Sequence, residues 1–358
     1  MSKTVIPFGP QHPVLPEPLH LKLVMEDEKI VEAIPAIGYV HRGLEKLTET
    51  KEFTQNVLII ERICGICSFK HGLAYCQGME ELMGITVPDR ARFLRVIWGE
   101  LHRMHSHLLW LGLLADAFGF ESLFMQVWRD REKVMDIMEE TAGSRVIISV
   151  NQIGGTRRDI SPEHLAKINT VVDEIKSDIE QVQNVFFNDY TVRHRLVGIG
   201  VLSKENAMKW GTVGPMARGS GVSQDLRTLG YAAYGELDFE PVVETDGDCY
   251  ARTKCRLREI YQSVDLIKQA IAKLPEGEIS VAFKGNPDGE VISRVEQPRG
   301  EALYYMRANG SKFLERVRVR TPTFANIPTL LKMLPGHHLA DVPILILTVD
   351  PCISCTER

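Results

Sequence analysis

The sequence has no apolar run long enough to cross a membrane and no segment that resembles a secretory signal peptide. Its longest apolar runs, residues 108–115 and 343–349, fall far short of the roughly 18 residues that a membrane-spanning helix needs. The amino terminus leads directly into a proline-rich stretch at residues 7–18, without the apolar core of a signal peptide. We therefore expect a cytoplasmic protein, and any attachment to a membrane has to come through other subunits.

A basic block and the glycine motifs of nucleotide binding are also missing. The formal net charge is −5, which argues against nucleic acid as a partner. No segment fits the phosphate-binding patterns GxxxxGKS or GxxxxGKT, and Gly198-Ile199-Gly200 lacks the third glycine of a dinucleotide-binding motif. No internal repeat and no change of composition divides the chain. We expect a single domain over residues 1–358 that binds neither nucleic acid nor nucleotide.

The apolar pattern predicts a mainly helical protein with small β elements, the α+β class. Residues 89–118 give the strongest helix signal, because Asp89 follows Pro88 and apolar residues then recur on one face. This segment is nearly apolar in its second half, so we expect it to be central. Further helices are expected at residues 48–60, 67–83, 121–140, 162–188, 203–209 and 252–274.

Short strands are expected near both ends of the chain. The prolines of residues 7–18 predict an extended segment, and alternating apolar residues between Leu19 and Ala33 predict a β-hairpin after it. The last third of the chain favours strands at residues 279–283, 317–319 and 344–349. The last of these strands leads directly into Asp350-Pro351-Cys352.

Four of the seven cysteines form two CxxC pairs near opposite ends of the chain, Cys64 with Cys67 and Cys352 with Cys355. The turn within each pair brings its two sulfurs to one side, so two pairs together can supply four thiolates. Thiolates select soft or borderline metals such as zinc, nickel, copper(I) and clustered iron. The second pair of a zinc ribbon follows about 15 to 20 residues after the first. Here the pairs can meet only if the whole fold brings them together.

A shared metal site is the preferred interpretation of these pairs, with unrelated thiols and a disulfide as the alternatives. A structural zinc is disfavoured, because such ions stabilise small domains, whereas 358 residues with 44% hydrophobic content can build a core. The remaining cysteines have no CxxC partner and are interpreted as small buried residues: Cys76, Cys249 and Cys255.

Three histidines on the predicted helix 89–118 form the pattern HxxHxH: His102, His105 and His107. This pattern differs from the HExxH of zinc proteases, so we interpret the three as packed or hydrogen-bonded core residues.

The surroundings of the two cysteine pairs carry a family resemblance. Residues 62–71 fit the pattern RxCGxCxxxH, and the second pair reads Asp350-Pro351-Cys352-Ile353-Ser354-Cys355. The two motifs at opposite ends of one chain resemble the large subunit of nickel-iron hydrogenases. The resemblance covers essentially the whole chain and implies that family's helical core with an N-terminal β-hairpin.

Other stretches resemble the energy-converting, membrane-bound (Ech-type) branch of these hydrogenases and its relative, the 49-kDa quinone-site subunit of respiratory complex I. They are residues 9–13, 41–46, 106–112 and 154–160. These stretches do not separate the two groups. The cysteines do, because the complex I subunit is similar in fold but has lost the nickel site, whereas this chain keeps all four.

By resemblance, the four cysteines hold a nickel-iron centre whose iron also carries carbonyl (CO) and cyanide (CN) ligands. Cys64 and Cys352 are expected to bind nickel terminally, and Cys67 and Cys355 to bridge nickel and iron. Cys352 is expected to take the first proton from H2. Glu17 stands where the family has its proton-relay glutamate, and the alternative is a solvated charge in a proline-rich loop.

The resemblance also implies residues around the centre. Arg299 and Thr323 match positions that donate to the cyanide ligands, and Arg299 counts among the catalytic residues. Pro322 precedes Thr323, and His71 closes the first motif, so both are expected to line the cofactor. Arg62 is expected to support the first cysteine pair. For the two arginines an ordinary surface role is the alternative.

One position departs from the wider family. Most members end in DPCxxCxxH, and that histidine helps a glutamate hold a buried metal ion. Here Arg358 stands in its place, as in the energy-converting branch. Because an arginine cannot ligate a cation, we expect Arg358 to replace both the histidine and the ion by pairing with Glu45 in a buried bridge.

These features predict the catalytic subunit of a multi-subunit hydrogenase that interconverts H2 with protons and electrons. The four cysteines of the CxxC pairs are assigned to the metal centre, so this chain cannot also hold an iron-sulfur cluster. The electrons therefore need a small subunit with a proximal 4Fe-4S cluster. By resemblance, the further partners are an iron-sulfur subunit, integral membrane antiporter-like subunits and ferredoxin, coupled to ion translocation at the cytoplasmic face of the membrane. The alternative is a quinone-reductase-like, complex I-related subunit with a structural zinc.

Overall fold

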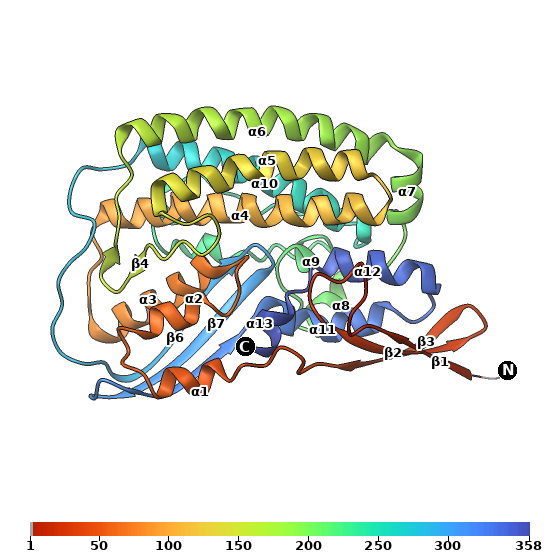
Figure 1. Ribbon diagram of the computed structural model, residues 1–358, viewed down its shortest axis with the longest axis horizontal. Helices are drawn as coiled ribbons and strands as arrows, with labels where there is room; N and C mark the ends of the chain where they lie inside the picture. The colour runs from red at the N-terminus through yellow and green to blue at the C-terminus, as the bar shows by residue number, and fades with distance from the viewer. Residues whose placement is uncertain (1–2) are drawn as a thin grey trace.

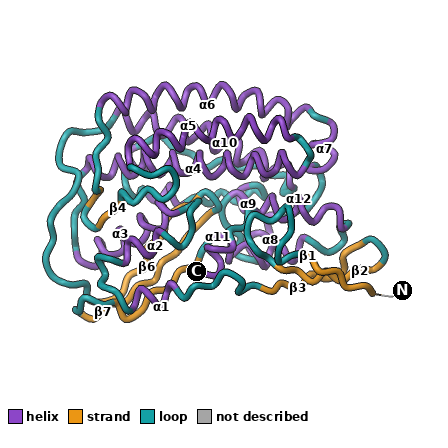
Figure 2. The backbone as a smooth tube through the Cα atoms, viewed as in Figure 1, coloured by secondary structure: helices purple, strands orange, loops and turns teal. Residues whose placement is uncertain are grey.

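The computed structural model describes residues 3–358. Long helices lie side by side in one layer, and the sheets β1–β3 and β6–β8 lie on the other side of α4 together with shorter helices (Figure 1). Figure 2 shows the same division, with the strands gathered on one side of the long helices. The long helices are α4 (Asp89–Ala117), α5 (Glu121–Ala142), α6 (Pro162–Asn188) and α10 (Cys249–Ala272).

Helix α4 is central, as its sequence predicts. Pro88 precedes the helix, and Asp89 places a negative charge in its first turn, where the helix dipole favours it. The helix packs against α5 and α10 on one side and against α12 (Val342–Val349) on the other. It is therefore buried along most of its length, and side chains from it reach the cysteine site.

Helix α6 shows why the helix predictions succeed where the pattern is long. Ser161 caps the helix by accepting a hydrogen bond from the N–H of His164, and Pro162 occupies its first turn. One stripe of α6 is buried: Ile168, Val172, Ile175, Ile179 and Val182. The other expected helices with clear counterparts are α3 (Ser68–Met83), α5, α8 (Lys204–Lys209) and α10.

The N-terminal hairpin is confirmed as β2 (His20–Glu26) and β3 (Lys29–Ala36), which pair antiparallel. The sequence predicts only an extended segment, residues 7–18, before this hairpin. Residues of β1 (Lys3–Phe8) also pair with β2, so the hairpin becomes a three-stranded sheet. Pro7 is tolerated because β1 lies at the edge of that sheet.

A second antiparallel sheet carries the site residue Arg299 in the turn between two of its strands. It consists of β6 (Asp288–Gln297), β7 (Gly300–Asn309) and β8 (Leu314–Arg320), of which only residues 317–319 were expected. Gln297 pairs with Gly300, so Pro298 and Arg299 form the two-residue turn between β6 and β7. Gly300 has φ +128°, and a Cβ there would come within 2.7 Å of the backbone of Gly214.

Two predictions near the cysteines need correction. Residues 48–60 form no continuous helix but parts of α1 (Leu44–Glu49) and α2 (Asn56–Glu61), separated by turns. Residues 344–349 are helical, within α12, and not a strand. A short run of Ile, Leu and Val cannot distinguish a buried strand from a buried helix, and Pro343 in the first turn favours the helix here.

Two further segments differ from the predictions, and several short elements connect the longer ones. Residues 279–283 form no strand, only an isolated bridge between Ser280 and Gly155. Helix α11 (Pro322–Met333) was not expected. Among the described residues, no helix is both long and apolar enough to cross a membrane. The short elements are β4 (Asn151–Gln152), β5 (Gly155–Thr156), α7 (Tyr190–Leu196), α9 (Pro215–Arg218) and α13 (Ile353–Glu357).

Candidate metal centre

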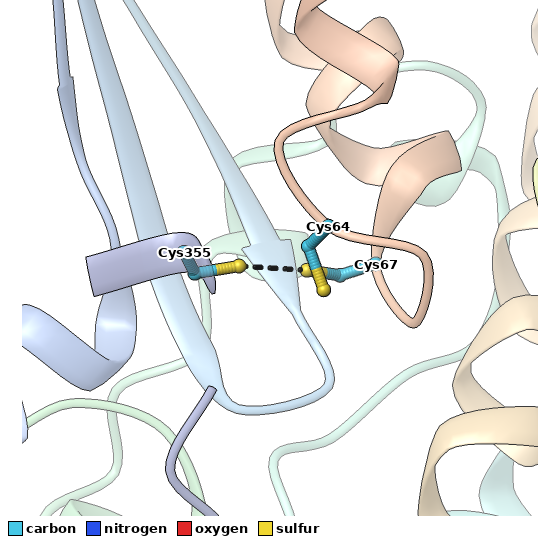
Figure 3. Close-up of side chains that lie close together, drawn as sticks. All are labelled: Cys64, Cys67 and Cys355. Atoms are coloured by element: carbon cyan, nitrogen blue, oxygen red, sulfur yellow. Dashed lines mark hydrogen bonds between the residues drawn. The ribbon is translucent and has the colours of Figure 1, made fainter. Parts of the chain in front are cut away.

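The two CxxC pairs meet in the interior of the fold. Cys64 and Cys67 lie on the loop between α2 and α3, and Cys352 and Cys355 lie at the start of α13 and within it. The Sγ atoms of Cys64 and Cys352 are 3.1 Å apart, and those of Cys67 and Cys355 are 3.2 Å apart. Figure 3 shows Cys355 facing the first pair from the opposite side. The whole fold therefore joins the two pairs, as the spacing required.

The four sulfurs are suited to a soft metal centre. The ligand atoms of Cys64, Cys67 and Cys355 lie within 4.8 Å of one another, and Cys352 contacts Cys64. All four cysteines are free and at most 4% exposed. A disulfide needs sulfurs about 2.05 Å apart, so the disulfide alternative is excluded.

The charge balance of the site calls for a cation. Burial raises the pKa of the Cys355 thiol well above its ordinary value. Burial acts in the same direction on Cys67, but hydrogen bonds with Cys352, Cys355 and Cys64 outweigh it and hold the pKa of Cys67 well below its ordinary value. Four thiolates cannot share this space without positive charge between them. Metal binding would therefore release protons from the site.

Residues at the start of α11 hold the second cysteine pair. The N–H of Cys352 donates to Oγ1 of Thr323 at 3.0 Å, and Oγ1 of Thr321 donates to the carbonyl of Cys355 at 3.0 Å. Pro322 lies between the two threonines in the first turn of α11. Thr323 and Pro322 thus lie beside the site as expected, and Thr323 binds the backbone of a cysteine.

Glu17 lies against the start of α13. One carboxylate oxygen accepts hydrogen bonds from the N–H groups of Ile353 and Ser354, the latter at 3.1 Å, and the other accepts from the hydroxyl of Ser354. The carboxylate is half-buried directly beside Cys352. These contacts do not fit a freely solvated charge.

Arg299 reaches the second cysteine pair from the tip of the β6–β7 hairpin. Its Nη2 lies 2.8 Å from Oδ1 of Asp350, its Nε donates to the carbonyl of Asp350 at 2.9 Å, and its Nη1 donates to Oγ of Ser106 at 3.1 Å. Burial alone lowers the pKa of Arg299, but the negative charges of Asp350 and of the cysteine sulfurs together outweigh it, and the pKa rises. The guanidinium therefore stays charged, and Arg299 does not play the alternative surface role.

The hairpin tip is itself fixed from α4. Arg103, which is fully buried, donates to the carbonyl of Glu296 at 3.1 Å and to that of Gln297 at 3.4 Å. Its own charge is balanced by Glu100, 3.1 Å from Nε. Arg103 thus holds the strand end that carries Arg299.

A cavity of about 380 Å³ leads to the cysteines. Its lining includes Glu17, Arg299 and Cys352, together with Leu109 of α4 and Trp128 of α5. The cavity thus brings together the residues that the resemblance assigns to chemistry.

His71 lies at the site as expected. Its Nε2 is 3.3 Å from Sγ of Cys355, and its Nδ1 hydrogen-bonds the hydroxyl of Tyr304 on β7. Since a tyrosine hydroxyl can donate or accept, both ring nitrogens have partners. His71 therefore connects a cysteine sulfur to the second sheet.

The role expected of Arg62 is wrong. Its side chain is exposed and donates to the carbonyl of Leu58 within the same helix turn, and among the described residues it makes no hydrogen bond to a cysteine. Arg42 supports the first pair in its place, because its guanidinium donates to the carbonyls of Arg62 and Ile63, directly before Cys64. The motif contains an arginine, but the supporting arginine comes from the preceding loop.

The expected pairing of Arg358 with Glu45 is present. Nε of Arg358 lies 2.7 Å from Oε1 of Glu45, and the Glu45 carboxylate also accepts from the N–H of Val319 and from Arg318. Burial raises the pKa of Glu45, but these donors outweigh it and lower the pKa. The side chains of Arg358 and Glu45 are 14% and 15% exposed, so the bridge is partly rather than fully buried.

Glu61, the last residue of α2, is a buried acid close to the first cysteine pair. Neither carboxylate oxygen has a hydrogen-bond partner among the described residues, and a Cβ at Gly72 would come within 2.7 Å of Oε1. Burial raises the pKa of Glu61 to about 7, against weaker effects of the nearby Ser149 hydroxyl and of the charges of Arg157 and Arg62. Between pH 4.5 and about 7, Glu61 is therefore protonated in the folded state and ionised in the unfolded state.

This proton predicts a loss of stability as pH rises. The stability contributed by protonated Glu61 is present in full below the unfolded pKa of 4.5 and is lost as pH rises through about 7. Over that window it amounts to about 3 kcal/mol. The variant Glu61→Gln should be more stable than wild type at pH 8 and similar at pH 5, as measured by denaturant unfolding. Glu205→Gln, at an exposed position, should show no such difference; a pH-independent effect of Glu61→Gln would contradict this account.

The fold and the site define a protein with a buried four-thiol centre suited to a soft metal. Two family models match the chain: "Respiratory-chain NADH dehydrogenase, 49 Kd subunit" over residues 117–284 and 281–358, and "Nickel-dependent hydrogenase" over residues 42–144. The chain belongs to the family that joins the large subunits of nickel-iron hydrogenases, in their membrane-bound branch, to the 49-kDa subunits of respiratory NADH dehydrogenase.

Individual relatives come from both sides of this family. The membrane-bound hydrogenase subunit alpha of Pyrococcus furiosus is 39% identical over 371 aligned residues, covering 99% of this chain and 87% of that protein. The carbon monoxide-induced hydrogenase of Rhodospirillum rubrum is 37% identical, with both chains covered in full. An NADH-quinone oxidoreductase component of Thermodesulfovibrio yellowstonii is 35% identical, covering 99% of this chain and 96% of that protein.

Several residues that hold the centre were not predicted from the sequence. Arg42 and Ser106 lie in the resembling stretches 41–46 and 106–112 and Thr321 precedes Pro322, but none of the three was assigned a role, and only the fold shows their contacts at the site. Asp350 is different, because it lies just before Cys352 in the second motif and could have been named as the partner of Arg299.

Proposed function

We propose that this chain is the catalytic subunit of an energy-converting nickel-iron hydrogenase, which interconverts H2 with two protons and two electrons. The observation that carries the proposal is the meeting of Cys64 with Cys352 and of Cys67 with Cys355, at 3.1 and 3.2 Å, in a chain of this family. Such a set of four buried sulfurs has the ligand chemistry that nickel and iron both accept.

The four cysteines would hold a nickel-iron centre whose iron carries CO and CN ligands, with Cys64 and Cys352 as terminal ligands and Cys67 and Cys355 as bridges. When bound, this centre supplies heterolytic cleavage of H2, which leaves a proton for the protein to accept. Arg299 supports the proposal as a fixed, charged donor on the cavity wall, where an anionic ligand such as cyanide would be stabilised.

The proton needs a path away from the cysteines. Sγ of Cys352 is the proposed first acceptor, and Glu17 is the proposed carrier. The carboxylate of Glu17 hydrogen-bonds the N–H of the residue after Cys352, and both side chains line the same cavity. A carboxylate in this position can accept a proton from the sulfur and pass it toward the cavity opening.

The variant Glu17→Gln is expected to slow D2/H⁺ exchange about a hundredfold, because an amide cannot carry the proton. Nickel content should stay unchanged, because the side chain still offers an oxygen to the start of α13. Exchange by isotope-resolved mass spectrometry and metal analysis on the same sample measure the two effects. Ser354→Ala, which removes one hydrogen bond of Glu17 but keeps the acid, is the matched control. Full exchange activity of Glu17→Gln would refute the relay.

The proposed partners follow from the electrons that H2 oxidation releases. A small subunit with a proximal 4Fe-4S cluster would accept them, and a further iron-sulfur subunit would exchange them with ferredoxin. Integral membrane antiporter-like subunits would hold this chain at the cytoplasmic face of the membrane and couple the reaction to ion translocation. The relative in Pyrococcus furiosus is named as a subunit of a membrane-bound hydrogenase, which supports this arrangement.

The Arg358–Glu45 pair is proposed to replace the metal ion that other members hold near the carboxyl terminus. Glu45 already has donors from Arg358, Arg318 and the N–H of Val319, so no lone carboxylate calls for a cation. A magnesium or iron ion bound by Glu45 in the purified complex would contradict this assignment.

The second candidate function is an electron-transfer subunit of the complex I type, in which the four cysteines hold a structural zinc. It is favoured by the match of the 49 Kd subunit model to residues 117–358. Metal analysis of the anaerobically purified complex separates the two. About one nickel per chain supports the hydrogenase, whereas one zinc per chain without nickel supports the second candidate.

A further inference from the structure

Buried nitrogen atoms without a hydrogen-bond partner lie along the contact between α4 and α5. They are Nδ1 of His102, Nδ1 and Nε2 of His105, Nε1 of Trp128 and Nε of Arg131. The two helices run side by side along this contact (Figure 1). We call these four residues the α4–α5 seam.

His102 forms the end of the seam nearest the cysteines. Its Nε2 lies 3.1 Å from the carbonyl of Val146 and 3.3 Å from the hydroxyl of Ser68, the residue after Cys67. Because a carbonyl only accepts, Nε2 carries the proton. Burial lowers the pKa of His102 to about 4, so the ring is neutral and Nδ1 is a bare acceptor. Nδ1 therefore needs a donor.

His105 continues the seam. Its ring centre lies 5.5 Å from that of His102, and the side chain is completely buried. Burial is the largest cause that lowers the pKa of His105 well below its ordinary value, and the positive charges of Arg131 and Arg299 act in the same direction. The ring is therefore neutral, with one N–H and one bare nitrogen, and it needs both an acceptor and a donor.

Trp128 and Arg131 form the other end of the seam. The guanidinium of Arg131 stacks on the ring of Trp128 at 5.3 Å, and the indole lies against Gly112 of α4, where a Cβ would come within 2.4 Å of Nε1. Trp128 also lines the cavity that contains Cys64 and Cys352. The seam residues thus lie between Ser68, beside one cysteine, and the wall of that cavity, and His105 is near enough to Arg131 for that charge to act on the pKa of the histidine.

The chemistry of the seam identifies its partner. The nitrogen atoms are inaccessible from outside the chain, so no side chain of another subunit can reach them. Buried polar groups in proteins are hydrogen-bonded, and the seam requires a molecule that both donates and accepts. Water meets this requirement and bridges such groups inside proteins.

We propose that the α4–α5 seam holds a file of ordered water molecules along which His105 passes protons between the cysteine site and the cavity at Trp128. For its role in proton transfer the proposal rests on the proposed function, and it gives the site a second route besides Glu17. The neutral imidazole accepts a proton on its bare nitrogen while the other nitrogen releases one to the next water. No net charge remains in the interior after the transfer.

The water file is tested directly by a cryo-EM map of the complete complex at a resolution that shows buried water elsewhere in this chain. The expected result is density for water within hydrogen-bond distance of both ring nitrogens of His105. A map with clear buried waters elsewhere and none along the seam would overturn the proposal. This test does not depend on the metal content, so it can fail or succeed separately from the hydrogenase assignment.

The proton role is tested by variants of the complete complex. In the Glu17→Gln background, where the main route is closed, His105→Leu should slow the remaining D2/H⁺ exchange about fivefold to tenfold, and His105→Gln should slow it equally, because an amide cannot carry a proton. His194→Leu, at an exposed position, should leave exchange unchanged. The nickel content should not differ among the variants, which separates proton transfer from loss of the site. If adding His105→Leu or His105→Gln to Glu17→Gln left the remaining exchange unchanged, the role of His105 would be overturned.

Discussion

Replacing Cys352 by serine should leave the purified complex with less than about a tenth of its nickel, and H2 oxidation should fall at least about a thousandfold. A serine oxygen is a hard ligand that is protonated at neutral pH, so it cannot replace a thiolate toward nickel. The surrounding backbone should stay in place, because the N–H of residue 352 would still donate to Thr323. Element analysis and H2-dependent dye reduction on the same sample measure both effects.

The control for this variant is another buried cysteine. Cys255 lies on α10, is fully buried and belongs to neither CxxC pair. Cys255→Ser should keep both nickel and activity, with a modest loss of stability from burying a hydroxyl. If Cys352→Ser retained nickel at the wild-type level, Cys352 would not be a ligand, and the four-sulfur site would have to be abandoned.

Replacing Arg299 by leucine should destabilise the chain by about 3–5 kcal/mol, because the change leaves the carboxylate of Asp350 buried without its cation. Both side chains of this ion pair are nearly inaccessible, at 6% and 7% exposure. Activity should fall as well, since the charged donor on the cavity wall is lost. Denaturant unfolding and H2 oxidation assays measure the two consequences separately.

Two further variants separate the charge of Arg299 from its geometry. In the double variant Arg299→Leu with Asp350→Asn, the unpaired carboxylate is gone, so much of the stability should return while activity stays low. Arg299→Lys keeps the charge but cannot donate to Asp350 and Ser106 at once as the guanidinium does. It should remain folded with activity reduced about tenfold to a hundredfold. Wild-type activity in Arg299→Lys would mean that charge alone is sufficient at this position.

The sequence predicts those parts of this fold whose pattern is long or whose chemistry is specific. Residues 89–118 and 162–188 extend over many helical turns, so their apolar spacing leaves little choice, and α4 and α6 follow it closely. The cysteine pairs are similarly specific, because thiols in two CxxC motifs have few other uses in a chain of this size. The two pairs do come together, with sulfurs 3.1 and 3.2 Å apart, as a shared site requires.

Short and tertiary features could not be predicted in the same way. Residues 344–349 are apolar except for Thr348, so their pattern does not distinguish a strand from a helix; Pro343 in the first turn and packing against α4 and α11 favour the helix. The β6–β7 hairpin was missed, although its tip places Arg299 at the site. The sequence also assigned the support of the first cysteine pair to Arg62 and not to Arg42. A motif gives the order of residues but not the direction in which each side chain points.

His105 illustrates the difference between burial and function. The sequence predicts a packed or hydrogen-bonded core residue, and the ring is indeed completely buried. His107 fits that interpretation, with Nε2 2.8 Å from Glu259, whereas His105 has no partner for either nitrogen among the described residues. Only the structure separates the two histidines, because their partners come from other parts of the chain.

The nickel-iron centre with diatomic ligands, proposed to be held by the four cysteines, has a spectroscopic signature of its own. It is tested by an infrared spectrum of the anaerobically purified complex in the region where metal-bound carbonyl and cyanide stretch. We expect one carbonyl band and accompanying cyanide bands, all absent from Cys352→Ser. A spectrum without such bands, from a sample that contains one zinc per chain, would contradict the nickel-iron assignment and give the four cysteines a structural role.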